Sequence, residues 1–295
     1  MSESFLQNLL LGGISGTIAK TSTAPLERTR ILLQTQASNP SIVTKYKGPL
    51  DCLMRIPKEE GFLAFWRGNG INVMRYFPTQ ALNFAFKERF RQLFVPDKKS
   101  GFWKVLGGNL LSGAAAGATT LSIVYPLDLA RTRIAALPAN AEKGIRACFG
   151  NILKVDGVKG LYRGFCISVI NVTLYRAGYF GIYDTIKPYF NDDFWSRYLV
   201  AQSGSLFTGV WLYPFDTVRK RLMMQSGRGA DMQYTGAIDC LVKIVRNEGP
   251  LVLFNGYMAN AFKGIGSSLV LVLYDELQDL VTEMKDGKAG RGDKF

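Results

Sequence analysis

Three glycines recur with the same spacing in three successive stretches of the chain. Gly48, Gly61 and Gly68 are separated by 13 and then by 7 residues, and two further sets repeat both gaps: Gly144, Gly157 and Gly164, then Gly236, Gly249 and Gly256. Repetition on this scale decides the architecture of a chain more strongly than any local pattern does. We therefore expect three similar units, over residues 1–97, 98–193 and 194–295, within one integral domain.

Each unit also carries a proline motif before its glycines. A proline is followed two residues later by an acid, and three residues after the acid by a base. The three copies are Pro25, Glu27 and Arg30; Pro126, Asp128 and Arg131; and Pro214, Asp216 and Arg219. A proline removes one backbone donor and can kink a helix. Three such kinks would bring the acids and bases together, so we expect them to close a ring of charges.

Long uncharged segments surround these motifs. Residues 105–127 and 198–215 hold no charged side chain and are long enough to cross the hydrocarbon layer of a bilayer. Four further segments are mostly apolar, but each contains a polar or basic residue: 5–26, 69–92, 165–186 and 257–280. Glycines four residues apart, such as Gly113 and Gly117, favour close helix packing in a membrane. The alternative is a set of buried helices in a large soluble protein.

The segments predict the fold class. Two crossings per unit give an all-α membrane protein with six transmembrane helices, pseudo-threefold symmetry and both termini on one side. Between the crossings lies a polar segment, such as residues 46–61 or 234–249, with apolar residues at helical spacing and basic residues between them. This pattern is typical of a short helix lying on the membrane face. We call the face that carries these helices the polar-segment side.

Composition excludes several classes of function. The chain has no histidine, which excludes His-ligated metals and His general bases, and its four cysteines are too scattered for a disulfide framework or a Cys₄ zinc site. No Gly-Lys-Ser/Thr phosphate loop is present, so we expect neither an enzyme nor a metal. The N-terminal residues lack the basic start of a secretory signal and the arginines of a transit peptide. The net charge of +13 would permit nucleic-acid binding, but the cations stand at repeat-matched positions beside apolar spans.

A second motif carries a family resemblance. An acid precedes the second glycine of each unit, and an aromatic residue and a base precede the third: Glu60 with Trp66-Arg67, Asp156 with Tyr162-Arg163, and Glu248 with Phe254-Asn255, where Asn replaces the base. Together with the proline motif, this pattern resembles that of the mitochondrial carrier family over nearly the whole chain.

Within that family the chain is most similar to the ADP/ATP carriers. Residues 75–87 resemble their second helix, and residues 211–226 resemble the segment that holds their arginine–methionine signature. The signature positions are Arg219, Lys220, Arg221, Leu222, Met223 and Met224. Lys220 and Leu222 stand where those carriers have an arginine and a methionine.

The resemblance implies a gate on each side of a central site. On the polar-segment side, which the resemblance identifies with the mitochondrial matrix, each acid is expected to pair with the base of the next unit: Glu27 with Arg131, Asp128 with Arg219, and Asp216 with Arg30. Gln34 would brace this ring from below. On the opposite, cytoplasmic side the equivalent positions are Glu88 and Arg91, Asp184 and Lys187, and Asp275 and Gln278. Gln278 cannot act as a cation, so we expect the unliganded protein to be closed on the polar-segment side.

The spacing after the third glycine of each unit points to a substrate site. Seven residues beyond it stand Arg75, Asn171 and Lys263, which should lie at one depth and face a central cavity. Two cations at mid-membrane suit an anion with several charges. No acid lies within a helical turn of either cation, so we expect neither to be held in a structural ion pair. Lys20 and Lys87 would add positive charge, with structural pairing as the alternative for both.

The resemblance implies more about the ligand. In the ADP/ATP carriers the positions of Arg75 and Lys263 contact phosphates, and those of Asn171, Val172 and Tyr175 line an adenine slot in which the tyrosine packs on the purine. Asn83 belongs to the matching second helix and is a further candidate for substrate binding.

The function implied is exchange of adenine nucleotides, ADP and ATP, across the mitochondrial inner membrane by alternating access. The resemblance further implies a multi-pass monomer that binds cardiolipin and needs no cofactor. Three positions depart from those carriers, since Asn171 replaces a glycine, Leu212 a serine and Lys263 an arginine. These departures leave open a different nucleotide-like or phosphorylated anion, or a carrier scaffold that acts mainly as an ion leak.

Overall fold

The computed structural model describes residues 3–95, 101–138, 144–186 and 194–266. Within these ranges every regular element is helical and no strand occurs, which confirms the predicted all-α class. The first unit comprises α1 (Glu3–Ser22), α2 (Ala24–Thr35), α3 (Pro49–Glu59) and α4 (Asn69–Phe94), with 3₁₀ turns at Gln36–Ser38 and Phe62–Trp66. The second comprises α5 (Phe102–Ala136), α6 (Ile145–Gly160) and α7 (Phe165–Ile186). The third comprises α8 (Phe194–Met224), α9 (Ala237–Asn247), 3₁₀ turns at Gly229–Asp231 and Pro250–Phe254, and helical residues 257–266.

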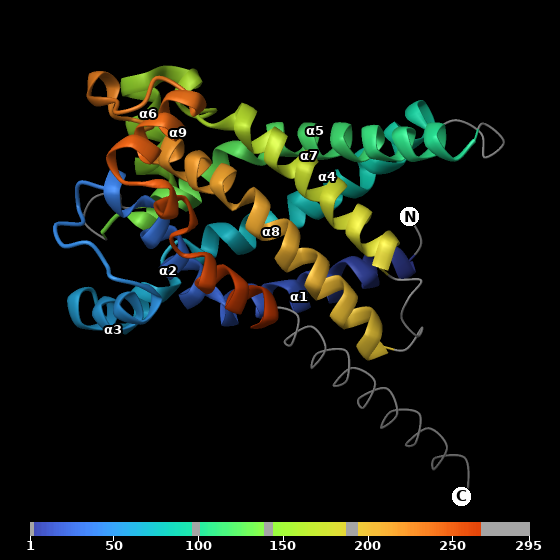
Figure 1. Cartoon of the computed structure of the whole chain (residues 1–295), viewed down its shortest axis with the longest axis horizontal. Coiled ribbons are helices and arrows are strands. Elements are labelled where there is room, and N and C mark those ends of the chain that lie inside the picture. Colours follow the sequence, from blue (N-terminus) through green and yellow to red (C-terminus); the bar gives the residue numbers. More distant parts are fainter. Residues whose placement is uncertain (1–2, 96–100, 139–143, 187–193, 267–295) are drawn as a thin grey trace, which may run out of the picture.

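Figure 1 shows the three short helices α3, α6 and α9 gathered at one end of the molecule, with the long helices extending from them. Among the long helices, α4 packs along α5, α5 along α7, and α7 along α8, while α1 packs against α4 and α2 against both α5 and α8. Helices of each unit therefore pack against helices of both other units. This arrangement places the proline motifs of the three units next to one another.

The first proline motif interrupts its helix and the other two do not. The helix breaks between α1 and α2 at Thr23, just before Pro25, whereas α5 and α8 continue through Pro126 and Pro214. Among the described residues the helix is thus interrupted at the proline motif in one unit only. Pro25 lies within the first positions of α2, where a missing N–H costs nothing, so a new helix can begin there.

Two of the freed carbonyl groups receive hydrogen bonds from the aromatic motif. Pro25 cannot donate to the carbonyl of Thr21, which instead accepts the indole N–H of Trp66 at 2.9 Å. Pro126 likewise leaves the carbonyl of Ser122, which accepts the hydroxyl of Tyr162 at 3.1 Å. Buried carbonyls need a partner. In these two units the aromatic residue before the base therefore supplies the hydrogen bond that the proline cannot donate; the third copy has Phe254, which cannot donate.

The third glycine of each unit allows a close approach to the next unit. Gly68, Gly164 and Gly256 have φ values of 82°, 79° and 82°. A Cβ on any of them would lie 3.2 Å from a backbone oxygen of the neighbouring unit, and these oxygens belong to Arg131, Arg219 and Arg30, respectively. Both the positive φ and the close contact disfavour a side chain there. The recurring glycines thus set how closely adjacent units can pack beside the charged ring.

A buried cysteine and an isoleucine four residues later anchor each short helix. The pairs are Cys52 and Ile56, Cys148 and Ile152, and Cys240 and Ile244, each in an apolar cluster formed mainly by its own unit. Burial raises the pKa of the Cys52 and Cys240 thiols to about 12, so both stay protonated and poorly reactive. Cys166 is the exposed cysteine, and all four are free thiols.

One described helical segment, Gly107–Ala136, is long and apolar enough by length and composition to cross a membrane. It contains most of the predicted span 105–127. The predicted span 198–215 lies within α8 but does not meet the same criterion.

The close approach at Gly68 generates a prediction. Gly68→Ala should lower the free energy of unfolding by about 1–3 kcal/mol, because it forces a left-handed backbone on alanine and crowds the carbonyl of Arg131. Gly70→Ala is the matched control, because its Cβ would meet nothing within 4 Å and its φ is not positive. Thermal unfolding of both purified variants measures the difference. Equal melting temperatures would show that the approach does not limit packing.

Candidate functional site: a charged ring beneath a cavity

Six charged side chains of the proline motifs meet where α2, α5 and α8 converge. Arg30 donates to Asp216 at 2.6 Å, Arg131 pairs with Glu27, and Arg219 pairs with Asp128. The three expected pairs are therefore present, and each joins one unit to the next. All six side chains are largely buried, so each carboxylate depends on its partner for compensation.

Each acid of the ring also holds a second cation. Lys263 lies 3.2 Å from Glu27, Arg75 lies 3.6 Å from Asp128, and Lys220 lies 3.2 Å from Asp216. The expectation that Arg75 and Lys263 stand outside any ion pair is therefore wrong. It rested on the absence of an acid within a helical turn, whereas the acids that reach these cations come from other helices.

The balance of charge in this ring is positive. Six cations face three carboxylates, which leaves an excess of three positive charges among these nine side chains. The Nε atom of Arg75 is buried and has no hydrogen-bond partner within the described part of the chain. Buried donors are normally paired. The ring can therefore attract an anion and still has a donor to offer it.

Gln34 is fully buried beneath the ring. Its side-chain amide donates to Asp216 at 2.9 Å and to the hydroxyl of Thr217 at 3.2 Å, and its side-chain oxygen accepts from Lys220 at 2.6 Å. It therefore links α2 to α8 at the position where the sequence placed a brace.

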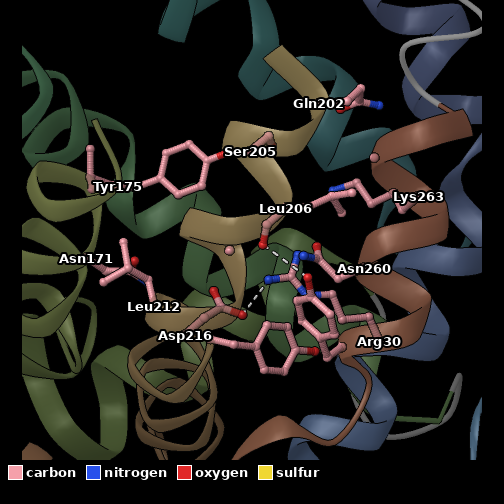
Figure 2. A pocket seen from close by; sticks show the side chains of 15 residues that line it. Arg30, Asn171, Tyr175, Gln202, Ser205, Leu206, Leu212, Asp216, Asn260 and Lys263 are labelled. Atoms are coloured by element: carbon pink, nitrogen blue, oxygen red, sulfur yellow. Dashed lines mark hydrogen bonds and ion pairs between the residues drawn. The ribbon is translucent and has the colours of Figure 1, made fainter. Parts of the chain in front are cut away.

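A cavity of about 380 Å³ lies above the ring, a size typical of small-molecule sites. It reaches from Arg30 and Asp216 at one end to Gln202 along α8 (Figure 2). A smaller cavity of about 220 Å³ lies at the level of the ring and is lined by all three acids and by Arg75.

The larger cavity collects four of the sequence-predicted substrate residues. They are Asn171, Val172, Tyr175 and Lys263. The hydroxyl groups of Tyr175 and Ser205 are 2.8 Å apart, and Figure 2 shows the tyrosine directed toward that serine. Leu212, one of the departures from the ADP/ATP carriers, lines the same cavity beside Asn171.

Sequence reasoning missed several polar residues of the cavity wall. They are Gln202, Ser205, Tyr257 and Asn260. Gln202, Ser205 and Gly209 follow each other at helical spacing inside the uncharged span 198–215, which was the signal available. Asn260 precedes Lys263 by three residues and so shares its helix face.

The remaining candidates are scattered or lie beyond the described residues. Lys20 stands over the ring of Tyr76 at 4.7 Å, a cation–π contact, and Asn83 is half-buried. Lys87, Glu88 and Arg91 are exposed toward the end of α4. The side chain of Asp184 and residues Lys187, Asp275 and Gln278 lie outside what the structure describes, so the opposite gate stays a prediction.

The arginine–methionine segment serves several purposes. Arg221 is fully buried and pairs with Glu248, with Nη2 and Oε2 2.9 Å apart. Leu222, Met223 and Met224 are buried in three different apolar clusters. A comparable buried pair in the first unit, Arg28 with Glu60 at 2.8 Å, was not anticipated from the sequence.

The structure describes no metal centre. Within the described ranges no three His, Cys, Asp or Glu side chains are grouped so that they could hold a metal ion.

The signature of the mitochondrial carrier protein family matches residues 2–98, 102–194 and 191–285. ADP/ATP translocase 2 of Rattus norvegicus is 52% identical over 289 residues, covering 93% of this chain and 97% of that protein. ADP/ATP translocase 3 of Homo sapiens is 50% identical over 292 residues, covering 94% and 98%. ADP/ATP translocase 4 of Bos taurus is 49% identical over 293 residues, covering 95% and 90%.

The three matches fall in succession and leave little of the chain uncovered. With three tandem copies of its signature and an all-helical fold, this chain belongs to the mitochondrial carrier family, and it is a membrane transporter rather than an enzyme.

Proposed function

We propose that this protein exchanges ADP and ATP across the mitochondrial inner membrane by alternating access, as a monomer with six membrane-crossing helices and bound cardiolipin. The assignment to a polyvalent anion rests on one observation. At the floor of a cavity, a ring of three carboxylates holds six cations. The excess of three positive charges complements a nucleoside di- or triphosphate. The identity of about half the chain to ADP/ATP translocases supports the choice of an adenine nucleotide.

The second cations suggest how binding is coupled to opening. A polyphosphate that enters the cavity competes with Glu27 for Lys263 and with Asp128 for Arg75. Each carboxylate that loses a cation is held less strongly in the closed ring. The substrate thereby favours the state open on the polar-segment side, because its phosphates replace the carboxylates as partners of those cations. The second, cytoplasmic gate belongs to the same proposal and comprises Glu88, Arg91, Asp184, Lys187, Asp275 and Gln278.

The other end of the cavity suits a flat aromatic base. Tyr175 offers a ring held by its hydroxyl contact with Ser205, and Asn171 offers an amide that can donate and accept hydrogen bonds.

Reconstitution tests the proposal directly. Proteoliposomes loaded with ATP should take up labelled ADP and should release ATP in return. Other phosphorylated anions and a leak of protons or chloride are measured in the same vesicles. Uptake of another anion without nucleotide exchange would overturn the assignment to adenine nucleotides.

Lys263→Ala should reduce nucleotide uptake by at least about tenfold, because it removes a charge-assisted contact with phosphate. The ring should survive, because Glu27 keeps its pair with Arg131. Lys243→Ala is the matched control, since Lys243 pairs with Asp239 on α9, away from the cavity, and its uptake should equal that of the parent. Unchanged uptake by Lys263→Ala would remove this residue from the substrate site.

Asp216→Arg should abolish exchange, because it places a second cation opposite Arg30 where the carboxylate partner stood. Losing one partner of a buried pair costs about 3–5 kcal/mol. The double variant Asp216→Arg with Arg30→Asp restores the pair in reverse and should recover part of the transport rate. A double variant no better than either single would show that this pair does not form the gate.

Asn171→Gly should improve ADP and ATP exchange relative to other anions, because it clears space beside Leu212 in the cavity wall. Competition for uptake between ADP and a phosphorylated anion without a base measures the change. A fall in ADP exchange would instead make Asn171 a contact that reads the base.

A further inference from the structure

A hydrogen bond between two hydroxyl groups crosses the wall of the larger cavity from unit 2 to unit 3. Tyr175 belongs to α7 and Ser205 to α8, and their hydroxyl oxygens are 2.8 Å apart. Both residues line the cavity, and Figure 2 shows the side chain of Tyr175 extending toward Ser205. The ring is therefore attached at two points, by its own backbone and by its hydroxyl group.

The two helices that carry this pair are in close contact about one turn further on. Gly178 and Thr208 each stand three residues after one member of the pair, so they lie on nearly the same helix faces. A Cβ on Gly178 would lie 2.9 Å from Cγ2 of Thr208, which is a buried residue. This packing sets the separation of α7 and α8, and with it the distance that the two hydroxyl groups span.

The pair breaks the threefold pattern of the chain. Ser205 stands nine residues before the proline of its motif, where the first two units have Gly16 and Gly117. At the equivalent junction between units 1 and 2, Gly117 has no side chain to offer. The residue equivalent to the tyrosine there is Thr79, whose hydroxyl donates to the carbonyl of Arg75 on its own helix at 2.7 Å. The bond between Tyr175 and Ser205 is thus a feature that can serve an asymmetric solute.

We propose that Ser205 is a positioning residue that holds the ring of Tyr175 in place for stacking on the base of a nucleotide. The proposal rests on the proposed function and deepens it, because it predicts that discrimination in favour of a base depends on this serine. Tyr175 remains 36% exposed, so the bond restrains the ring without covering it. A ring that is already restrained loses less conformational freedom when a base packs on it.

Binding of two ligands to the purified carrier tests the proposal. ADP carries a base, whereas inorganic pyrophosphate carries the same number of phosphates without one. The stabilisation of the protein against heat at increasing ligand concentration gives a dissociation constant for each. The ratio of the two constants measures what the rest of the nucleotide contributes. A general loss of stability or of positive charge changes both constants together and leaves the ratio unchanged.

Ser205→Ala should reduce the preference for ADP over pyrophosphate about three- to tenfold, which is the range that one hydrogen bond typically contributes, and should leave pyrophosphate binding unchanged. Ser205→Thr keeps a hydroxyl group and should retain most of the parental ratio. Tyr175→Phe removes the same bond from the other side and should act like Ser205→Ala. The double variant should be no further from the parent than the larger single. Ser203→Ala is the matched control, because this exposed serine donates to the carbonyl of Val200 on its own helix at 3.0 Å.

Three results would contradict the role of Ser205: a parental ratio in Ser205→Ala, an equal loss of affinity for both ligands, or single effects that multiply in the double variant. If Ser205→Ala fails to fold, Tyr175→Phe decides, because it removes the same bond and keeps the ring. Exchange of ADP for ATP by the parent tests the proposed function separately. Exchange together with a parental ratio in Ser205→Ala rejects the role of this serine alone. A preference for ADP that Ser205→Ala lowers, in a carrier that does not exchange ADP for ATP, rejects the exchange and leaves the role of Ser205 standing.

Discussion

The closed end of this carrier depends on three buried carboxylates that find their cations in neighbouring units. Glu27, Asp128 and Asp216 each lie where two units meet, and the arginine that pairs with each comes from the adjoining unit. A buried acid without a partner is costly, so the ring is stable only when all three units are drawn together. Under the proposed function, closure and charge pairing are therefore one event, and an anion that competes for the cations also competes with closure.

The backbone is adapted to bring these charges together. The glycine that precedes the second long helix of each unit has no side chain, and it thereby leaves room for the backbone carbonyl of the ring arginine of the next unit. The proline two residues before each acid leaves a carbonyl without its donor, and Trp66 and Tyr162 supply that donor from the aromatic motif. The two recurring motifs are thus complementary parts of one contact, although they stand far apart in the sequence.

The threefold spacing made the ring predictable, because residues at equivalent positions of equivalent units must lie at one level. The second cations could not be predicted in the same way. Lys263 reaches Glu27 across most of the chain, and a search for acids within a helical turn cannot detect such a contact. The break at Thr23 was equally hidden, since all three units carry the same proline and one alone ends its helix there. Spacing sets the depth of a residue, whereas partners depend on how far a side chain reaches between helices.

Symmetry also indicates which residues of a three-unit carrier can distinguish one solute from another. A ring built from three equal units can open and close but cannot orient an asymmetric solute, so recognition must come from residues that occur in one unit only. Asn171 and Tyr175 fulfil this condition in the cavity wall, and Gln34 and Lys220 fulfil it below the ring. The first pair lines the larger cavity, whereas Gln34 is fully buried and Lys220 lines the smaller cavity at the level of the ring. Under the proposed function, departures from symmetry in the cavity wall set which anion is bound, because the three equal parts of the ring cannot distinguish one end of a solute from the other.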